Sequence, residues 1–434
     1  MANIDFTRRR LLAGITAGTA MAASGLARAA DLVVPVAPPA GRSPADLARD
    51  ESFWHEVGGF YERTRGILNL EQGYWGRMAR PVRDAYIDAL RMVDAQNSYY
   101  ARKDYEADDA EATRRIARAL GAHDDEIVIT RNATEAFQSL VGQYRGLEAG
   151  DTVLLADIDY PGFKQHMHWL AGARGVDVVE IELPPRADQA TIRQLYIDAF
   201  DANPKTRLML IMHVSNQHGL TVPVADIAAE ARERGIDVIC DAAQSWGLLD
   251  YEVSDLGVDW AAFNLHKWIG APLGSGVLYM RRGTLDRIAP FPGESDEQRV
   301  ASRIHPGTVN FATRLAIPAA LDFHEALGPA NKEARLRYLR SLWTDAATEM
   351  PHLEVLGGAD EASWSGIGSF RLRGKTTVGD AQALQARMEY EFGIFTVIRK
   401  GLASGACVRV TPQVFNSADE IGRLVDALRR LADA

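Results

Sequence analysis

The chain has 434 residues, of which 47% are hydrophobic and 24% charged, and a formal net charge of −10. This length suggests about two or three domains of a globular protein. The negative charge, without a Lys/Arg run outside the N-terminus, argues against nucleic-acid binding. Two cysteines, Cys240 and Cys407, provide neither a disulfide framework nor a zinc site.

The first 29 residues have the pattern of an export signal. They contain TRRRLLAG at 7–14, a mild apolar run, and Ala27-Arg28-Ala29 in the form of a cleavage site. The segment resembles a twin-arginine signal, which implies recognition by the twin-arginine export machinery, cleavage near Ala29 and a periplasmic protein. A disordered basic tail is the alternative. The apolar run is too short for a membrane span, so we expect no stable membrane insertion.

Residues 30–65 are interpreted as a linker and N-terminal segment, Pro-rich over 30–50. Strands then alternate with amphipathic helices, which predicts an α/β fold with a mostly parallel seven-stranded sheet flanked by helices. The last strand follows the sixth too closely for a crossover helix, so it should be antiparallel. The expected strands are 126–130, 152–156, 177–183, 207–213, 237–240, 259–264 and 275–280.

We expect this sheet to form a large domain over 66–317. A helix at 315–327 leads into further strand patterns in SGIGSFRLR, GIFTVIRKG and ACVRVTPQ, and the chain closes with a helix at 417–433. These elements predict a smaller C-terminal α+β domain over 318–434. Ligands of open α/β sheets bind at the carboxyl ends of the strands, so residues that follow each strand are the candidates for chemistry.

Two charged residues follow neighbouring predicted strands. Asp241 ends the buried strand of VICDAAQSWG, where an unpaired carboxylate is costly, and Lys267 follows the next strand in DWAAFNLHKW. A desolvated lysine can bind an aldehyde covalently, and a nearby carboxylate suits a protonated pyridine nitrogen. A helix start at TRNATEAFQSL offers free N–H groups and the Thr134 hydroxyl to a phosphate. Together these features predict a pyridoxal 5′-phosphate (PLP) site.

Four motifs in order carry a family resemblance. In chain order they are TRNATEA, HVSNQHG, DAAQ and HKW. The lysine of HKW follows the Asp of DAAQ by 26 residues. The chain over 66–434 resembles the class V aminotransferase family of fold-type I PLP-dependent enzymes, which includes cysteine desulfurases, isopenicillin N epimerase and kynureninase. The resemblance implies the fold of a fold-type I PLP-dependent transferase and PLP as cofactor.

The resemblance also implies residue roles. Lys267 matches the catalytic lysine that binds the cofactor, and Asp241 the partner of the pyridine nitrogen. Gln244 matches the donor to the phenolic oxygen, His266 a phosphate or ring neighbour, and Ala133 with Thr134 the phosphate cradle. Asn264 departs from the second phosphate-binding hydroxyl of desulfurases. Thr308 of RIHPGTVN matches a residue that reaches the other subunit's cofactor, which implies a homodimer.

Aromatic and basic residues complete the predicted site. Tyr160 or Phe163 of DIDYPGF would stack on the cofactor ring, and we favour Tyr160, with ordinary packing as the alternative. Arg409 matches the residue that binds a substrate α-carboxylate, with Asn216 assisting. Arg399 matches a second, more mobile arginine, for which a surface ion pair is the alternative.

The expected substrate is an amino acid or a peptide-derived small molecule, and the expected reaction at its α-carbon is that of an epimerase, aminotransferase or lyase. Between Arg399 and Arg409 only Cys407 occurs, within a predicted strand, which disfavours persulfide chemistry. Two segments resemble the isopenicillin N epimerase-like branch of the family: NLHKWIGAPLGSGVLYM and GTVNFATRLAIPAALDF. This branch includes C–S lyases and an exported siderophore-modifying enzyme.

The twin-arginine resemblance adds the hypothesis of periplasmic tailoring of a peptide natural product such as a siderophore. A catalytically silent PLP-fold binding protein and a cysteine desulfurase or C–S lyase are the alternatives. We predict no metal site, because His166, His168 and His218 lack a metal-ligand spacing with a carboxylate.

Overall fold

A seven-stranded sheet forms the centre of the protein in a computed structural model that describes residues 37–433. Its strand order is β2-β9-β8-β7-β6-β3-β4, and β9 alone runs antiparallel to its neighbours. The sheet prediction is therefore confirmed, including the antiparallel last strand. The strands are β2 (Ile127–Thr130), β3 (Thr152–Ala156), β4 (Asp177–Ile181), β6 (Thr206–Met212), β7 (Asp237–Asp241), β8 (Trp260–Asn264) and β9 (Gly276–Met280).

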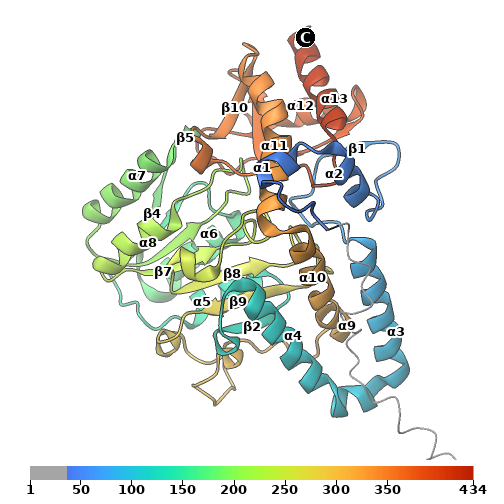
Figure 1. Ribbon diagram of the computed structural model, residues 1–434. Helices are drawn as coiled ribbons and strands as arrows, with labels where there is room; N and C mark the ends of the chain where they lie inside the picture. The colour runs from blue at the N-terminus through green and yellow to red at the C-terminus, as the bar shows by residue number, and fades with distance from the viewer. Residues whose placement is uncertain (1–36, 434) are drawn as a thin grey trace, which may run out of the picture.

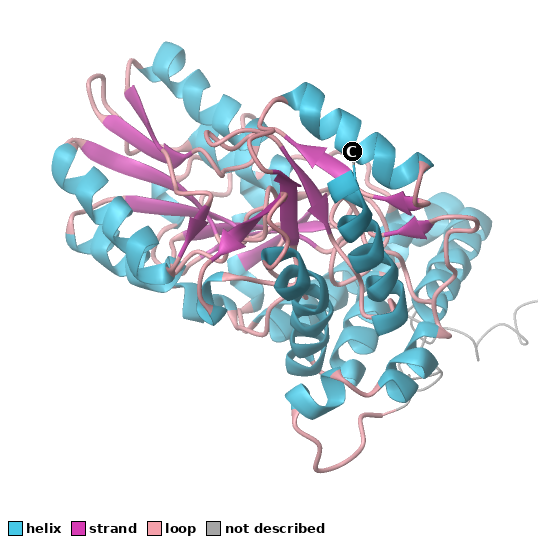
Figure 2. Cartoon of the chain, turned by 90° about the horizontal axis from the view of Figure 1, so that it is seen from above, coloured by secondary structure: helices cyan, strands magenta, loops and turns pink. Residues whose placement is uncertain are grey.

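Both faces of this sheet are covered by helices (Figures 1 and 2). Successive residues of β6 enter different apolar clusters: Leu208 and Leu210 pack on one face, and Met209 and Ile211 on the other. This is why the strands are nearly continuous apolar runs. One face packs on α5 (Ala133–Gln143) and α6 (Pro161–Arg174), and the other on α4 (Tyr105–Leu120), α7 (Gln189–Ala202), α8 (Val224–Glu233) and α10 (Ile317–Leu327).

Two short helices, α1 (Pro44–Ala48) and α2 (Glu51–Gly58), occupy part of the segment interpreted as a linker. Asp50 caps α2 by accepting the N–H of Phe53, and Trp54 and Val57 are buried. α1 packs against α11 (Pro329–Thr348) of the C-terminal part. The linker interpretation is therefore wrong for 44–50, because these residues help to bury an apolar core. The long helix α3 (Arg80–Lys103) follows and leads to α4.

The C-terminal part is the predicted α+β arrangement, drawn in orange and red in Figure 1. Its five-stranded sheet has the order β13-β14-β11-β10-β5, and β5 is contributed from between β4 and α7. A separate pair, β1 with β12, joins the N-terminal segment to this part. The remaining elements are β1 (Leu68–Asn69), β5 (Arg186–Ala187), β10 (Leu353–Gly358), β11 (Gly368–Leu372), β12 (Ile394–Phe395), β13 (Val397–Arg399), β14 (Cys407–Val410), α9 (Phe311–Leu315), α12 (Val378–Tyr390) and α13 (Ala418–Arg430).

The carboxyl ends of β6, β7 and β8 meet at one edge of the central sheet. Met212 and Asp241, which end β6 and β7, lie side by side, and Asp241 pairs with Ala262, two residues before the end of β8. The predicted signal peptide of residues 1–29 falls outside the described residues. Among residues 37–433, no helix is long and apolar enough to cross a membrane.

Candidate active site

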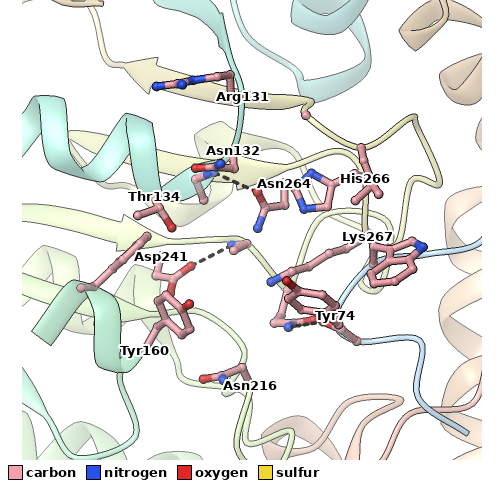
Figure 3. A pocket seen from close by; sticks show the side chains of 18 of the residues that line it. Tyr74, Arg131, Asn132, Thr134, Tyr160, Asn216, Asp241, Asn264, His266 and Lys267 are labelled. Carbon is pink, nitrogen blue, oxygen red and sulfur yellow. Dashed lines mark hydrogen bonds between the residues drawn. The ribbon is translucent and has the colours of Figure 1, made fainter. Parts of the chain in front are cut away.

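A cavity of about 480 Å³ opens at this edge of the sheet (Figure 3). Side chains reach it from β7, from the loop after β8, from the start of α5 and from the two arginine-bearing strands β13 and β14. Ten of the predicted site residues line it: Ala133, Thr134, Tyr160, Asn216, Asp241, Gln244, His266, Lys267, Arg399 and Arg409. The sequence prediction therefore brought together residues that are up to 276 positions apart.

Asp241 ends β7 with a buried carboxylate that faces the cavity. The residue is 3% exposed, and its carboxylate accepts one hydrogen bond, 2.9 Å long, from the backbone N–H of Ala243. Burial raises the pKa of Asp241 from 3.8 to about 6. A buried carboxylate with so few donors favours a cationic partner in the cavity.

Lys267 lies in the loop after β8, and its label is on the other side of the cavity from that of Asp241 in Figure 3. Burial lowers the pKa of its amine from 10.5 to about 8, so a neutral fraction is present near neutral pH. Its backbone is held from two sides. Gly76 N–H donates to the carbonyl of His266 at 2.8 Å, and the Lys332 amine donates to the carbonyl of Trp268 at 2.9 Å. Lys267 is therefore positioned by hydrogen bonds to the backbone carbonyls on both sides of it, one from a backbone N–H and one from a buried amine.

Gly76 is required at its position by this close approach. A Cβ atom there would lie 1.8 Å from the Lys267 carbonyl oxygen. Only a residue without a side chain allows the N-terminal segment to run along the lysine loop.

The start of α5 differs in one respect from the predicted phosphate cradle. The backbone N–H of Ala133 already donates to Asn264 Oδ1 at 2.9 Å, and Asn132 caps the helix through the N–H of Glu135. The N–H of Ala133 is thus engaged by Asn264 in this structure, and its role toward a phosphate stays a prediction. Since Oδ1 faces Ala133, the Asn264 amide nitrogen is left as a donor, and it joins Thr134 at the cavity wall.

Gln244 and His266 are both oriented by their neighbours. Gln244 Oε1 accepts from the Trp268 indole at 2.8 Å, and Nε2 donates to the Gly73 carbonyl at 2.9 Å, which leaves one N–H. His266 Nδ1 lies 2.9 Å from the Ser275 carbonyl, so Nδ1 carries the proton and Nε2 is the free nitrogen. Burial lowers the pKa of His266 to about 4. An anion at Nε2 would raise that pKa again.

Of the two candidate aromatic residues, Phe163 is committed to the core. Its ring stacks on Phe137, with centroids 4.0 Å apart and planes 5° from parallel. Tyr160 precedes α6 and is 41% exposed at the cavity. Tyr160 therefore has a ring face available for stacking.

Arg409 and Arg399 occupy adjacent antiparallel strands but have different surroundings. Arg409 is buried, and its Nη2 donates to both carboxylate oxygens of Glu71 at 2.6 and 2.8 Å. Its Nη1 donates to the carbonyl of Asn216 at 2.8 Å. Among the described residues, the Arg399 side chain has neither an ion pair nor a hydrogen bond. Its surface ion pair, the alternative interpretation, is absent from this part of the chain.

Residues 82–424 match the model of the family described as "Aminotransferase class-V". The chain belongs to this family. It is 27% identical to "Isopenicillin N epimerase" of Streptomyces clavuligerus over 87% of this chain and 98% of that relative. It is also 26% identical to "Probable cysteine desulfurase" of Vibrio cholerae over 74% of this chain and 82% of the relative.

Solved structures support the fold of this class V chain. The apo cysteine desulfurase of Thermococcus onnurineus superposes with a TM-score of 0.72 at 20% identity, over 85% of this chain and 95% of that one. A complex of the cystine C–S lyase C-DES with cysteine persulfide gives 0.73 at 23% identity, over 84% and 98%. These likenesses confirm the fold-type I prediction.

The protein is a PLP-dependent class V enzyme that acts on amino acids. The cavity fits this cofactor, because it combines a buried, underpaired carboxylate at Asp241 with a desolvated amine at Lys267 and free donors at Thr134 and Asn264. When bound, PLP withdraws electrons from the bonds of an amine's α-carbon. In this class V site Asp241 would face the ring nitrogen, and Lys267 would exchange a proton with the α-carbon.

The cysteines of this class V chain lie away from the chemistry. Cys240 and Cys407 are buried in β7 and β14, and burial raises the pKa of the Cys407 thiol to about 11. The loop between the two arginines is tied down by the Ala403 N–H, which donates to Asp157 at 2.9 Å. These surroundings do not activate a thiol.

Thr308 is exposed and does not line the cavity of its own chain. Its role toward the cofactor of another subunit stays a prediction.

The turn after β1 supplies four contributors that sequence reasoning missed: Glu71, Gly73, Tyr74 and Trp75. Only Gly76 in QGYWG hinted at a close backbone approach.

Proposed function

We propose that the enzyme removes the α-proton of an amino acid or amino-acid-derived amine, with Lys267 as the base. The observation that carries this proposal is the pairing, in one cavity, of an underpaired buried carboxylate at Asp241 with a lysine whose pKa is lowered to about 8. An amine with that pKa is neutral in a useful fraction near neutral pH and can accept a proton. Asp241 stabilises the charge that the proton leaves behind.

The test is proton NMR of the PLP-loaded protein in heavy water with L- and D-amino acids and glutamyl peptides. We expect loss of one α-proton signal with the wild-type protein and no loss with Lys267→Ala. The product then assigns the reaction: an inverted amino acid means epimerase, a keto acid aminotransferase, and a released fragment lyase. No exchange, combined with an amine-induced change in cofactor absorbance, would instead favour a catalytically silent binding protein.

The surroundings of the cysteines weigh against the persulfide chemistry of a desulfurase. Cys407 is buried with a pKa raised to about 11, and the loop before it carries no other thiol. A C–S lyase without a nucleophilic cysteine stays within the proposed α-carbon chemistry. Sulfide release from L-cysteine that survives Cys407→Ser would identify such a lyase.

We further propose export to the periplasm by the twin-arginine route, a homodimer, and a peptide natural product such as a siderophore as substrate. The N-terminal pattern of residues 7–29 supports the export proposal. Replacement of Arg8, Arg9 and Arg10 by Lys should retain a fused reporter in the cytoplasm. Light scattering of the purified full-length chain should give twice its mass of 47.6 kDa.

A further inference from the structure

The carboxylate of Glu71 is bound to the guanidinium of Arg409, which would otherwise be available to a substrate carboxylate. Arg409 is 0% exposed and Glu71 only 6%, so the pair is screened from water. Arg409 Nη2 contacts both Glu71 oxygens, while its Nη1 is engaged by the carbonyl of Asn216. A second carboxylate at this guanidinium would lie next to the charge of Glu71, and like charges at such distances in a buried site repel strongly.

Backbone pairing fixes Glu71 in this position. The segment bridges in parallel to Thr411, and Thr411 N–H donates to the carbonyl of Leu70 at 2.8 Å. The Glu71 N–H is held by Asn69 Oδ1 at 2.8 Å. On the other side, a Cβ atom at Gly73 would lie 2.7 Å from Arg409 Nη2. The backbone of Glu71 is therefore fixed beside Arg409 by the pairing of residues 70–71 with Thr411.

Arg399 lies on the neighbouring strand, and no carboxylate within residues 37–433 contacts it. Val397 and Arg399 of β13 pair with Arg409 and Cys407 of β14. Arg399 Nε is buried without a partner, and no carboxylate of the described chain contacts its guanidinium. Burial and the nearby Arg409 lower the pKa of Arg399 to about 10, which still leaves it charged at neutral pH. A half-buried guanidinium that no carboxylate contacts favours an anionic ligand.

A second cavity of about 760 Å³ begins at Arg399. Tyr74, Trp75, Leu273 and Arg399 line both this cavity and the cofactor cavity, so the two are adjacent. Of the other basic residues of the second cavity, Arg83 pairs with the Glu62 carboxylate, and Arg77 donates to the Glu62 carbonyl and the Thr64 hydroxyl. Among the described basic residues that line this cavity, Arg399 is the one whose guanidinium has neither kind of partner.

We propose that Glu71 removes Arg409 from substrate binding, and that Arg399 receives the substrate's carboxylate at the junction of the two cavities. This inference rests on the proposed function, because it assigns the substrate class of the same site. The substrate is an amino-acid derivative that presents a carboxylate to Arg399 and extends into the second cavity. Glu71 thereby determines specificity against small amino acids that need Arg409.

The experiment is calorimetric titration of the PLP-loaded protein with glutarate, a dicarboxylate that has no amine and cannot react. We expect Arg399→Gln to weaken glutarate binding by about ten- to hundredfold, the range for a charge-assisted hydrogen bond. The double variant Glu71→Gln/Arg409→Gln replaces both charged groups of the buried pair by neutral amides, and it should change the affinity by less than about threefold.

The single variant Glu71→Gln uncovers the charge of Arg409, so it should strengthen glutarate binding by about tenfold. The matched control is Glu354→Gln, which removes a carboxylate from the Glu354–Arg371 pair in the same five-stranded sheet, away from both cavities. It should leave the affinity unchanged. Cofactor absorbance and the unfolding midpoint show whether each variant folds. Should Glu71→Gln not fold, the double variant and Arg399→Gln decide.

Three results would overturn the inference: no glutarate binding by the wild-type protein, no effect of Arg399→Gln, or a loss in the double variant as large as in Arg399→Gln. Because glutarate has no α-amine, these results do not depend on proton transfer by Lys267. Failure of the α-proton exchange would refute the proposed function while leaving the arginine assignment to be judged by calorimetry alone.

Discussion

Replacement of Asp241 by Asn should stabilise the cofactor-free protein above pH 6. In the unfolded chain this carboxyl ionises near 3.8, whereas burial raises its pKa in the folded protein to about 6. Between these values the folded state binds more protons than the unfolded state, so the free energy of unfolding falls as the pH rises. The difference amounts to about 3 kcal/mol, and it is fully present above pH 6. An amide is neutral throughout and keeps the hydrogen bond from Ala243.

The assay is urea unfolding of cofactor-free wild-type protein and Asp241→Asn at about pH 4 and pH 8, the two sides of the folded pKa. We expect near-equal stability at the lower pH and a variant more stable by up to about 3 kcal/mol at the higher pH. With PLP bound, the order should reverse, because a protonated ring nitrogen would stabilise the wild-type carboxylate. A variant that is less stable at both pH values without cofactor would refute the reasoning.

Asp159 provides the matched control. It is also fully buried, burial raises its pKa well above the usual value, and it does not line the cofactor cavity. Asp159→Asn should therefore also stabilise the cofactor-free protein at pH 8, but it should retain the full stabilisation by PLP. If Asp159→Asn and Asp241→Asn both lost the stabilisation by PLP, that stabilisation would not depend on the charge of Asp241.

Four further outcomes follow from the contacts of the site. Gly76→Ala should lower the free energy of unfolding by about 1–3 kcal/mol in urea titrations, because its Cβ atom would meet the Lys267 carbonyl. The rate of PLP uptake by stopped-flow absorbance should rise about tenfold per pH unit below pH 8 and level off above, since only the neutral amine of Lys267 attacks. Trp268→Phe should shift the cofactor absorbance maximum, because it frees the Gln244 amide to rotate. Asn264→Ala should raise the dissociation constant of PLP about tenfold in equilibrium dialysis. A flat pH profile, an unshifted spectrum or an unchanged constant would contradict the respective contact.

The central sheet could be predicted from the sequence because its determinants are local. Each strand is a short apolar run, and the short connection before β9 excludes a crossover helix, which fixes that strand as antiparallel. Asp241 and Lys267 stood out because a charged residue directly after an apolar run is visible without the fold. Parallel strands then bring such residues to one edge, which is why two residues in separate motifs share one cavity.

The counterion of Arg409 could not be predicted in the same way. Glu71 lies 338 positions earlier in the chain and comes next to Arg409 only because β1 pairs with β12 and Glu71 itself bridges to Thr411. No local pattern distinguishes that glutamate from a surface one. Asn264 is a second residue whose contacts could not be predicted. From the sequence it only departs from the phosphate-binding hydroxyl of desulfurases, but in the structure its amide oxygen accepts the N–H of Ala133 and its amide nitrogen remains as a donor at the cavity.

The pairing of Glu71 with Arg409 reduces the positive charge around Lys267. A free Arg409 would add a second unpaired cation beside Arg399 and further lower the pKa of Lys267, which both arginines already depress. With Glu71 in place, Arg409 is paired, and Lys267 and Arg399 are the charged basic groups that line the cavity with Asp241 without a carboxylate contact among the described residues. The anion-binding capacity of the cavity is thus moved from Arg409 to Arg399, toward the larger second cavity, so that the position of one glutamate links the protonation of the base to the size of the substrate.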